Sequence, residues 1–167
     1  MEELTHSNAE QNAIARQLAK HLHNVYHGGN WTVSNMKELL DDVNWQEATR
    51  QVHDFNTIAT LVFHTGYFVG VLLMVLEGKP LDAHDKYSFA HPPILNQTDW
   101  DAFCATQFEQ VKKTIQLLEN LPDEQLTRPF SDPKYGTWFR NINGIIEHTH
   151  YHLGQIALIK KLVRASK

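Results

Sequence analysis

The sequence contains a single cysteine, Cys104, so no disulfide can form within the chain. Chains without such cross-links are typical of a reducing compartment, and we expect a cytoplasmic location. The first four residues include two acidic side chains and lack the charged and apolar regions of a signal peptide. The sequence also has no block of basic residues and a net charge of −4, which predicts no binding to nucleic acid.

A long uninterrupted apolar run is also missing. The most apolar stretch, residues 58–76, has polar side chains in or beside its first half, and only residues 67–76 are free of them. That clean part is too short for a membrane span, which needs roughly 20 apolar residues, so we expect none. Internal repeats and low-complexity tracts are absent as well. The length of 167 residues and an ordinary composition predict one globular domain, residues 1–167.

Apolar residues that recur at helical spacing predict four long helices, and therefore an all-α fold. These helices span approximately residues 9–26, 49–77, 98–121 and 139–164. A short helix through residue 40 is predicted after Ser34, which we expect to be its N-cap, and Thr98 or Asp99 is expected to cap the third long helix. Residues 79–97 contain three prolines and no sustained stripe, which predicts a long loop. Loops of this length are often functional, for instance as lids.

Histidine is unusually frequent, with eleven in the chain. In the last predicted helix, His148 and His152 are four residues apart and lie within the apolar arc, whereas His150 points to the far side. Two imidazoles on a core-facing surface need partners, because burying an unpartnered polar group is costly. A histidine pair at this spacing can present two nitrogens to one metal ion, which predicts a metal site.

His64 is the best candidate for a third ligand, because it shares a core-facing stripe with Leu61 and Phe68. Three histidines with an open position are typical of a catalytic zinc site, and nickel or iron also suits imidazole ligands. Gln155 lies on the stripe of His148 and could orient a ligand or face the open position. The alternative is that these histidines are hydrogen-bonded core residues and that Gln155 is a partly exposed helix residue.

These residues resemble the DinB/YfiT-like superfamily of predicted metalloenzymes, over nearly the whole chain. The most specific element is residues 148–156, which are similar to the closing His-x-x-x-His-x-x-Gln motif of that superfamily. Gly29-Asn30-Trp31, and Phe55-Asn56-Thr57-Ile58 leading to His64, resemble two further segments. The resemblance implies an up-down-down-up four-helix bundle. It also implies a three-histidine metal site formed by His64, His148 and His152.

Some members of the superfamily are thiol-dependent S-transferases or isomerases that use low-molecular-weight thiols, and many have no known activity. In a first hypothesis, a thiol cosubstrate binds the metal and attacks a small electrophile, which requires no nucleophile from the protein. In a second, the metal activates water for hydrolysis, but Glu147 points away from the His148 stripe and no other carboxylate lies on it. In a third, the protein is a non-enzymatic metal-binding or ligand-binding module. The catalytic residues and the small-molecule substrate stay open.

Residues 63–76 are apolar nearly all round the helix, so a second face needs a cover. Gly66 and Gly70 are four residues apart, which allows two backbones to approach closely. The cover is either the loop of residues 79–97 or a second copy of the chain, and we favour a two-fold homodimer. Arg128 and Arg140 are candidates for holding an anionic group of a thiol or substrate, and the alternative is that both are solvated.

Overall fold

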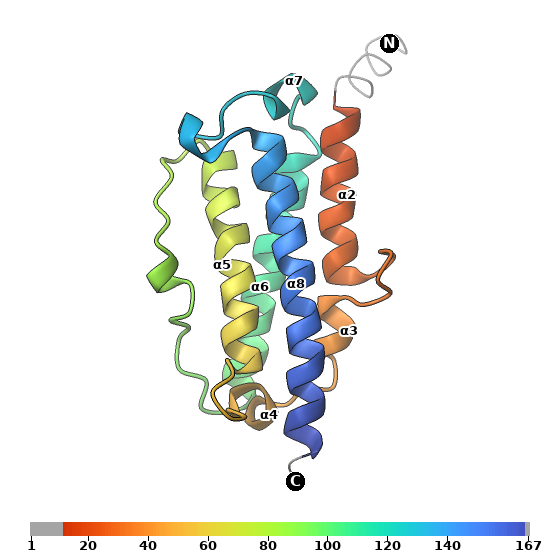
Figure 1. The fold of residues 1–167 in the computed structure, drawn as a ribbon, viewed down its shortest axis with the longest axis vertical. Helices are drawn as coiled ribbons and strands as arrows, with labels where there is room; N and C mark the ends of the chain where they lie inside the picture. Colours follow the sequence, from red (N-terminus) through yellow and green to blue (C-terminus); the bar gives the residue numbers. More distant parts are fainter. Residues whose placement is uncertain (1–11, 166–167) are drawn as a thin grey trace.

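The structure is a computed structural model and describes residues 12–165 (Figure 1). Its long helices are α2 (Ala13–His27), α5 (Ile58–Leu76), α6 (Gln97–Leu118) and α8 (Trp138–Ala165). In Figure 1, α2 and α8 run from top to bottom, whereas α5 and α6 run from bottom to top. An up-down-down-up bundle has this pairing of directions. The prediction of a first helix from residue 9 falls partly on residues outside the described range.

Short helices occupy the connections between the long ones. They are α3 (Met36–Leu40), α4 (Trp45–Thr49) and α7 (Asp123–Leu126), with 3₁₀ turns at Asp85–Tyr87 and Pro133–Tyr135. Within residues 12–165 there is no β-strand. The predicted all-α class is therefore confirmed for the part of the chain that the structure describes.

Asparagine side chains cap the starts of three helices, α3, α4 and α6. The Oδ1 atom of Asn35 accepts a backbone N–H three residues later at 3.0 Å, which caps α3. Asn96 caps α6 in the same way at 2.9 Å. The expected caps, Ser34 and Thr98 or Asp99, were therefore wrong. Asparagine is as good an N-cap as serine or aspartate, so several adjacent candidates could not be separated by residue type.

The long helix predicted over residues 49–77 begins later than expected, at Ile58. α4 ends at Thr49, and α5 begins only at Ile58, where Thr57 Oγ1 accepts the backbone N–H of Thr60 at 3.1 Å. Between the two helices, His53 adopts a φ of 49°, which a right-handed helix cannot accommodate. His64 consequently lies in the second turn of α5 rather than in the middle of a longer helix.

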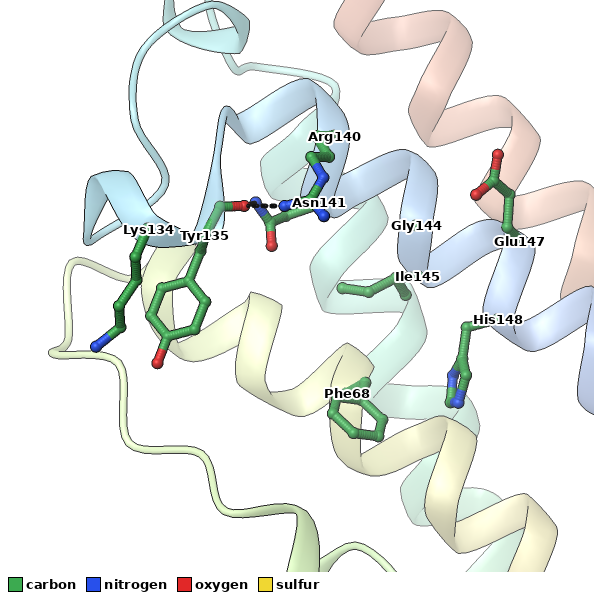
Figure 2. A pocket seen from close by; sticks show the side chains of 9 residues that line it. All are labelled: Phe68, Lys134, Tyr135, Arg140, Asn141, Gly144, Ile145, Glu147 and His148. Atoms are coloured by element: carbon green, nitrogen blue, oxygen red, sulfur yellow. Dashed lines mark hydrogen bonds between the residues drawn. The ribbon is translucent and has the colours of Figure 1, made fainter.

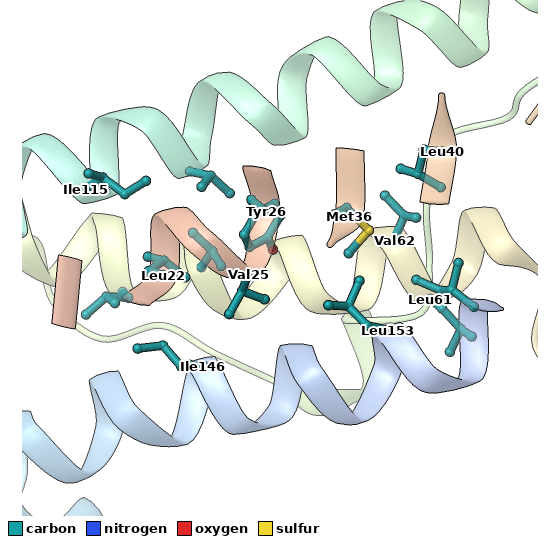
Figure 3. Packing of buried hydrophobic residues seen from close by; sticks show 14 of the residues in the cluster. Leu22, Val25, Tyr26, Met36, Leu40, Leu61, Val62, Ile115, Ile146 and Leu153 are labelled. Atoms are coloured by element: carbon teal, nitrogen blue, oxygen red, sulfur yellow. The ribbon is translucent and has the colours of Figure 1, made fainter. Parts of the chain in front are cut away.

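A hydrophobic core fills the space between the long helices (Figure 3). Its members come from every long helix, and α5 packs against both α6 and α8. Side chains with 2% exposure or less include Leu22, Tyr26, Leu61, Ile146 and Leu153. Complete burial of each aliphatic side chain stabilises the fold by roughly 1.5–3 kcal/mol.

α5 is long and apolar enough to span a membrane by length and composition alone. Its most apolar window is 61% buried inside the bundle, so its place in the core accounts for its composition. Gly66 and Gly70 face α6, where a Cβ atom would lie 1.8 Å from Gln107 Oε1 and 2.7 Å from Gln110 Oε1, respectively. These glycines therefore leave room for two glutamine side chains of α6 of the same chain. They no longer support a homodimer, which stays a prediction.

The loop of residues 79–97 covers part of the outer face of α5. The Tyr67 hydroxyl accepts the backbone N–H of His84 at 2.9 Å and donates to the backbone oxygen of His84 at 3.2 Å. Further along the loop, the ring of His91 lies 6.4 Å from that of Phe63. The sequence left two possible covers for α5, this loop or a second copy of the chain. Over this part of α5, the cover is the loop.

Candidate metal centre

Three histidine rings converge between α5 and α8. His148 Nε2 lies 3.0 Å from His64 Nε2 and 3.0 Å from His152 Nε2. One ligand atom from each ring lies within 4.8 Å of the other two, an arrangement that could hold a metal ion. His64 and His152 are buried and His148 is half-buried. The structure therefore brings together the three histidines that the sequence singled out.

The neighbouring histidine of α8 takes no part in this cluster. The ring of His150 lies 5.9 Å from that of His21 of α2, on another side of the helix. Residues four apart on a helix share a face, whereas a residue two positions away is turned by about 200°. His150 is therefore separate from the pair of His148 and His152, as expected, but it is half-buried beside α2 rather than turned outward.

A hydroxyl from the loop fixes the orientation of the His64 ring. His64 Nδ1 lies 2.8 Å from Ser88 Oγ, and Ser88 is completely buried. The Ser88 hydroxyl donates its only proton to the backbone oxygen of Asp85 at 2.7 Å, so it must accept from His64 Nδ1–H. The Nε2 atom of His64 consequently carries the lone pair and directs it toward the other two rings.

An amide within α8 orients the His152 ring in the same sense. His152 Nδ1 donates to Gln155 Oε1 at 2.7 Å, and Gln155 Nε2 donates to the Tyr151 hydroxyl at 3.0 Å. This contact leaves His152 Nε2 as the unprotonated nitrogen. Gln155 was expected either to orient a ligand or to face the open position. In the structure it orients a candidate ligand, His152. Such outer contacts set the tautomer and the ring orientation of metal-bound histidines.

The donor set fits a divalent metal ion. Nitrogen lone pairs that face one another at 3.0 Å repel, unless a proton or a cation lies between them. A zinc–nitrogen distance of about 2.0–2.1 Å in a tetrahedral site places neighbouring nitrogens about 3.3–3.4 Å apart, close to the spacing in the cluster. Three imidazoles suit zinc, nickel or iron, so the residues do not select one of these metals.

Burial keeps the cluster unprotonated. Desolvation, followed by the charges that His152 and His64 would carry, lowers the pKa of His148 to about 4. The pKa of His64 is lowered by burial and then by His152, and that of His152 is lowered by burial. All three rings are therefore neutral at pH 7, which is the form that binds metals.

Two site residues in the loop were not found from the sequence. They are Ser88, which contacts His64 Nδ1, and Phe89. Phe89 stacks on the His64 ring with a centroid distance of 4.1 Å and an interplanar angle of 16°. The length of the loop was the only signal for a lid, because a serine followed by an aromatic residue is too common to stand out. Ser88 and Phe89 close the side of the cluster that faces the loop.

An open cavity of about 570 Å³ lies beside His148 (Figure 2). Its walls come from Phe68 of α5, the Pro133–Tyr135 turn and the first half of α8. Arg140 lines this cavity, whereas Arg128 forms a surface ion pair with Glu124 at 3.4 Å. Of the two arginines considered from the sequence, the structure therefore places one at the cavity that reaches the histidines.

Together these features define an all-helical protein with a three-histidine cluster that could hold a metal ion. The family model of the DinB superfamily matches residues 29–156, a range that includes all three histidines and Gln155. The chain therefore belongs to the DinB superfamily. Comparisons with curated proteins and with solved structures each give no match.

Proposed function

We propose that the protein is a metal-dependent thiol S-transferase, or a thiol-dependent isomerase, that acts on small electrophiles. His64, His148 and His152 would hold zinc, nickel or iron. The convergence of three Nε2 atoms, two of them fixed by Nδ1–H contacts to Ser88 and Gln155, carries this proposal. A metal bound there supplies Lewis acidity and lowers the pKa of a coordinated thiol or water.

The residues around the cluster hold two of the rings in place and leave the third ring at the open cavity. Ser88 and Gln155 hold the rings of His64 and His152, while Phe89 covers the His64 ring and limits access of water from the loop side. His148 is the ring that lines the open cavity. A small molecule in the cavity would therefore meet the cluster at His148, which supports a site that binds a substrate as well as a metal.

The only cysteine supports the use of a thiol from a cosubstrate. Cys104 lies on α6, is half-buried and is not among the residues that line the cavity at His148. Burial, followed by the nearby charge of Asp101, raises the pKa of the Cys104 thiol to about 12. This thiol is protonated at pH 7 and is a poor nucleophile, because the thiolate is the reactive form.

Metal-dependent hydrolysis is the alternative reaction, and it lacks an evident base. Glu147 lines the cavity, but in Figure 2 its carboxylate points away from the His148 ring. Glu147 Oε1 accepts a hydrogen bond from Asn143 Nδ2 at 2.7 Å. Asp85 Oδ1 lies 3.3 Å from Ser88 Oγ, and its charge partly opposes the lowering of the His64 and His148 pKa values, but Asp85 does not line the cavity at His148. A thiol cosubstrate needs no such base and therefore fits this site better.

The test is a thiol-transfer assay on protein stripped of metal and then reloaded separately with zinc, nickel or iron. We expect 3-mercaptopropionate to react with a small alkyl halide faster with loaded protein than with metal-free protein. His148→Ala should remove the increase, and His150→Ala should keep it. Metal binding without turnover would support the binding-module alternative. Ester hydrolysis that needs metal but no thiol would support the hydrolase.

A further inference from the structure

The cavity beside His148 has a chemically distinct far end. Arg140 lines it there, and Phe68 and Ile145 line its wall, whereas Lys134 lies beyond Tyr135 with its amino group directed away from Arg140 (Figure 2). Arg140, Gly144 and His148 follow one another at intervals of four residues, so successive members of this row are neighbours on α8. At 1.5 Å per residue, the two ends of the row are about 12 Å apart along the helix.

Gly144 leaves the middle of this row open. A Cβ atom at Gly144 would have no heavy atom within 4 Å, so the space between Arg140 and His148 is free of side chains at that position. The cavity volume of about 570 Å³ is within the usual range for small-molecule sites. A compact ligand can therefore extend from the arginine to the histidine cluster.

The backbone before α8 holds the Arg140 side chain at this end. Arg140 Nη1 donates to the backbone oxygen of Tyr135 at 2.9 Å. Gly136 has a φ of 79°, and a Cβ atom there would lie 3.0 Å from Arg140 Cδ. Glycine thus permits the turn and leaves room for the arginine side chain. Such a fixed arginine loses less conformational entropy when it binds a ligand.

The charge of Arg140 is available to a ligand. Among residues 12–165, no carboxylate forms an ion pair with Arg140. Lys134 pairs with Asp132 at 3.1 Å at an exposed position, where such a pair contributes little. The acidic residue of the lining, Glu147, is bound to Asn143 and directed away from the cavity. Arg140 is therefore the anion-binding group of the cavity.

From these contacts we infer that the cavity binds an acidic small molecule, whose carboxylate is held by Arg140 and whose opposite end reaches His148. The planar guanidinium fork matches a carboxylate, and charge-assisted hydrogen bonds of this kind are the strong ones. This inference rests on the proposed function in one respect, because it identifies the thiol cosubstrate as one that carries a carboxylate.

The test compares 8-mercaptooctanoate with 8-mercaptooctan-1-ol, two thiols of equal chain length that are long enough to span the row and that differ in charge. Binding is followed by amide shifts of residues 134–148 in NMR spectra of both metal-free and zinc-loaded protein. We expect saturable shifts and an affinity about tenfold higher for the acidic thiol. Arg140→Gln should remove this preference and leave the affinity for the neutral thiol unchanged. Arg128→Gln, which removes an equal charge outside the cavity, should keep the preference.

A second pair of variants tests the place of binding. Gly144→Leu should abolish the shifts for both thiols because it fills the cavity, whereas Gly154→Leu, at an exposed position of the same helix with equal space, should not. Equal affinities for the two thiols, or equal effects of Arg140→Gln and Arg128→Gln, would overturn the inference even if metal binds. If no metal binds but the acidic thiol still saturates the cavity, the proposed function fails and the anion site stands.

Discussion

Ser88 Oγ lies 2.8 Å from His64 Nδ1, so a residue of the long loop orients a candidate ligand on α5. The contact joins two groups that are buried in the fold. A loop bound in this way is more than a connection between α5 and α6, because it helps to determine which nitrogen of His64 is free to bind metal.

Ser88→Ala should weaken metal binding by about 10–100-fold, since loss of an outer hydrogen bond to a metal-bound histidine has effects of this size. The substitution leaves His64 Nδ1–H without its acceptor in a buried position. Isothermal titration with zinc measures the effect, and circular dichroism checks that the helices remain. Tyr87→Phe, which removes a hydroxyl from an exposed neighbour, is the matched control. Equal zinc affinity in the Ser88→Ala variant would show that the contact does not support the site.

The second prediction separates the three histidines of α8. His148→Ala or His152→Ala should each abolish stoichiometric metal binding, because each removes one of three converging nitrogens. His150→Ala should leave the stoichiometry unchanged, since the His150 ring faces His21 instead. Elemental analysis after dialysis measures the metal content of all three variants. Equal loss of metal in the His150→Ala variant would contradict the assignment of faces.

The sequence was sufficient for part of this site. His148, His152 and Gln155 lie on one helix, and their shared face follows from helical periodicity, which is a local property. His64 was found because a polar residue interrupts an apolar stripe that repeats within its own helix. The resemblance to the DinB superfamily led to the same three histidines, and the family match covers them.

The remaining contacts depend on packing between distant segments. Ser88 and Phe89 reach His64 only because the loop returns along α5, and nothing in residues 79–97 encodes that path locally. Gly66 and Gly70 did indicate that something packs closely on this face, but their spacing could not show that it is two glutamine side chains of α6 rather than a second backbone. A local pattern identifies a face that needs a partner, whereas the partner itself is a property of the whole fold.

The third prediction concerns pH. The folded-state pKa of each cluster histidine is lowered, and that of His148 falls to about 4, whereas the unfolded value is about 6.5. Between these values the unfolded state binds more protons than the folded state. The free energy of unfolding of the metal-free protein should therefore decrease as pH falls from about 6.5 to about 4. Urea unfolding at several pH values measures the slope, which should be shallower in the His148→Leu variant.

The pH dependence of metal binding should follow the folded-state pKa values of the three histidines. Because burial lowers the pKa of all three rings, saturating zinc should remain bound below pH 6.5 and should be released as the pH approaches 4, the pKa of His148. Equilibrium dialysis across this range gives the pH of half-occupancy. Release already complete at pH 6 would show that burial does not protect the cluster from protons. Occupancy unchanged well below pH 4 would exclude histidine ligands.

The last prediction is that the chain forms a two-fold homodimer, but through a different face of α5 from the one that carries Gly66 and Gly70, which α6 occupies. Val71, Met74 and Val75 lie at helix spacings of three and four residues, so they are neighbours on one side, and each is only half-buried in a single chain. Met74→Glu should shift the protein to a monomer, because a charge in an apolar interface is costly to bury. Gly70→Leu is unsuitable for this test, since its side chain would collide with Gln110 and destabilise the monomer itself. Sedimentation at micromolar concentration measures the association, and a wild-type protein that sediments as a monomer would contradict it.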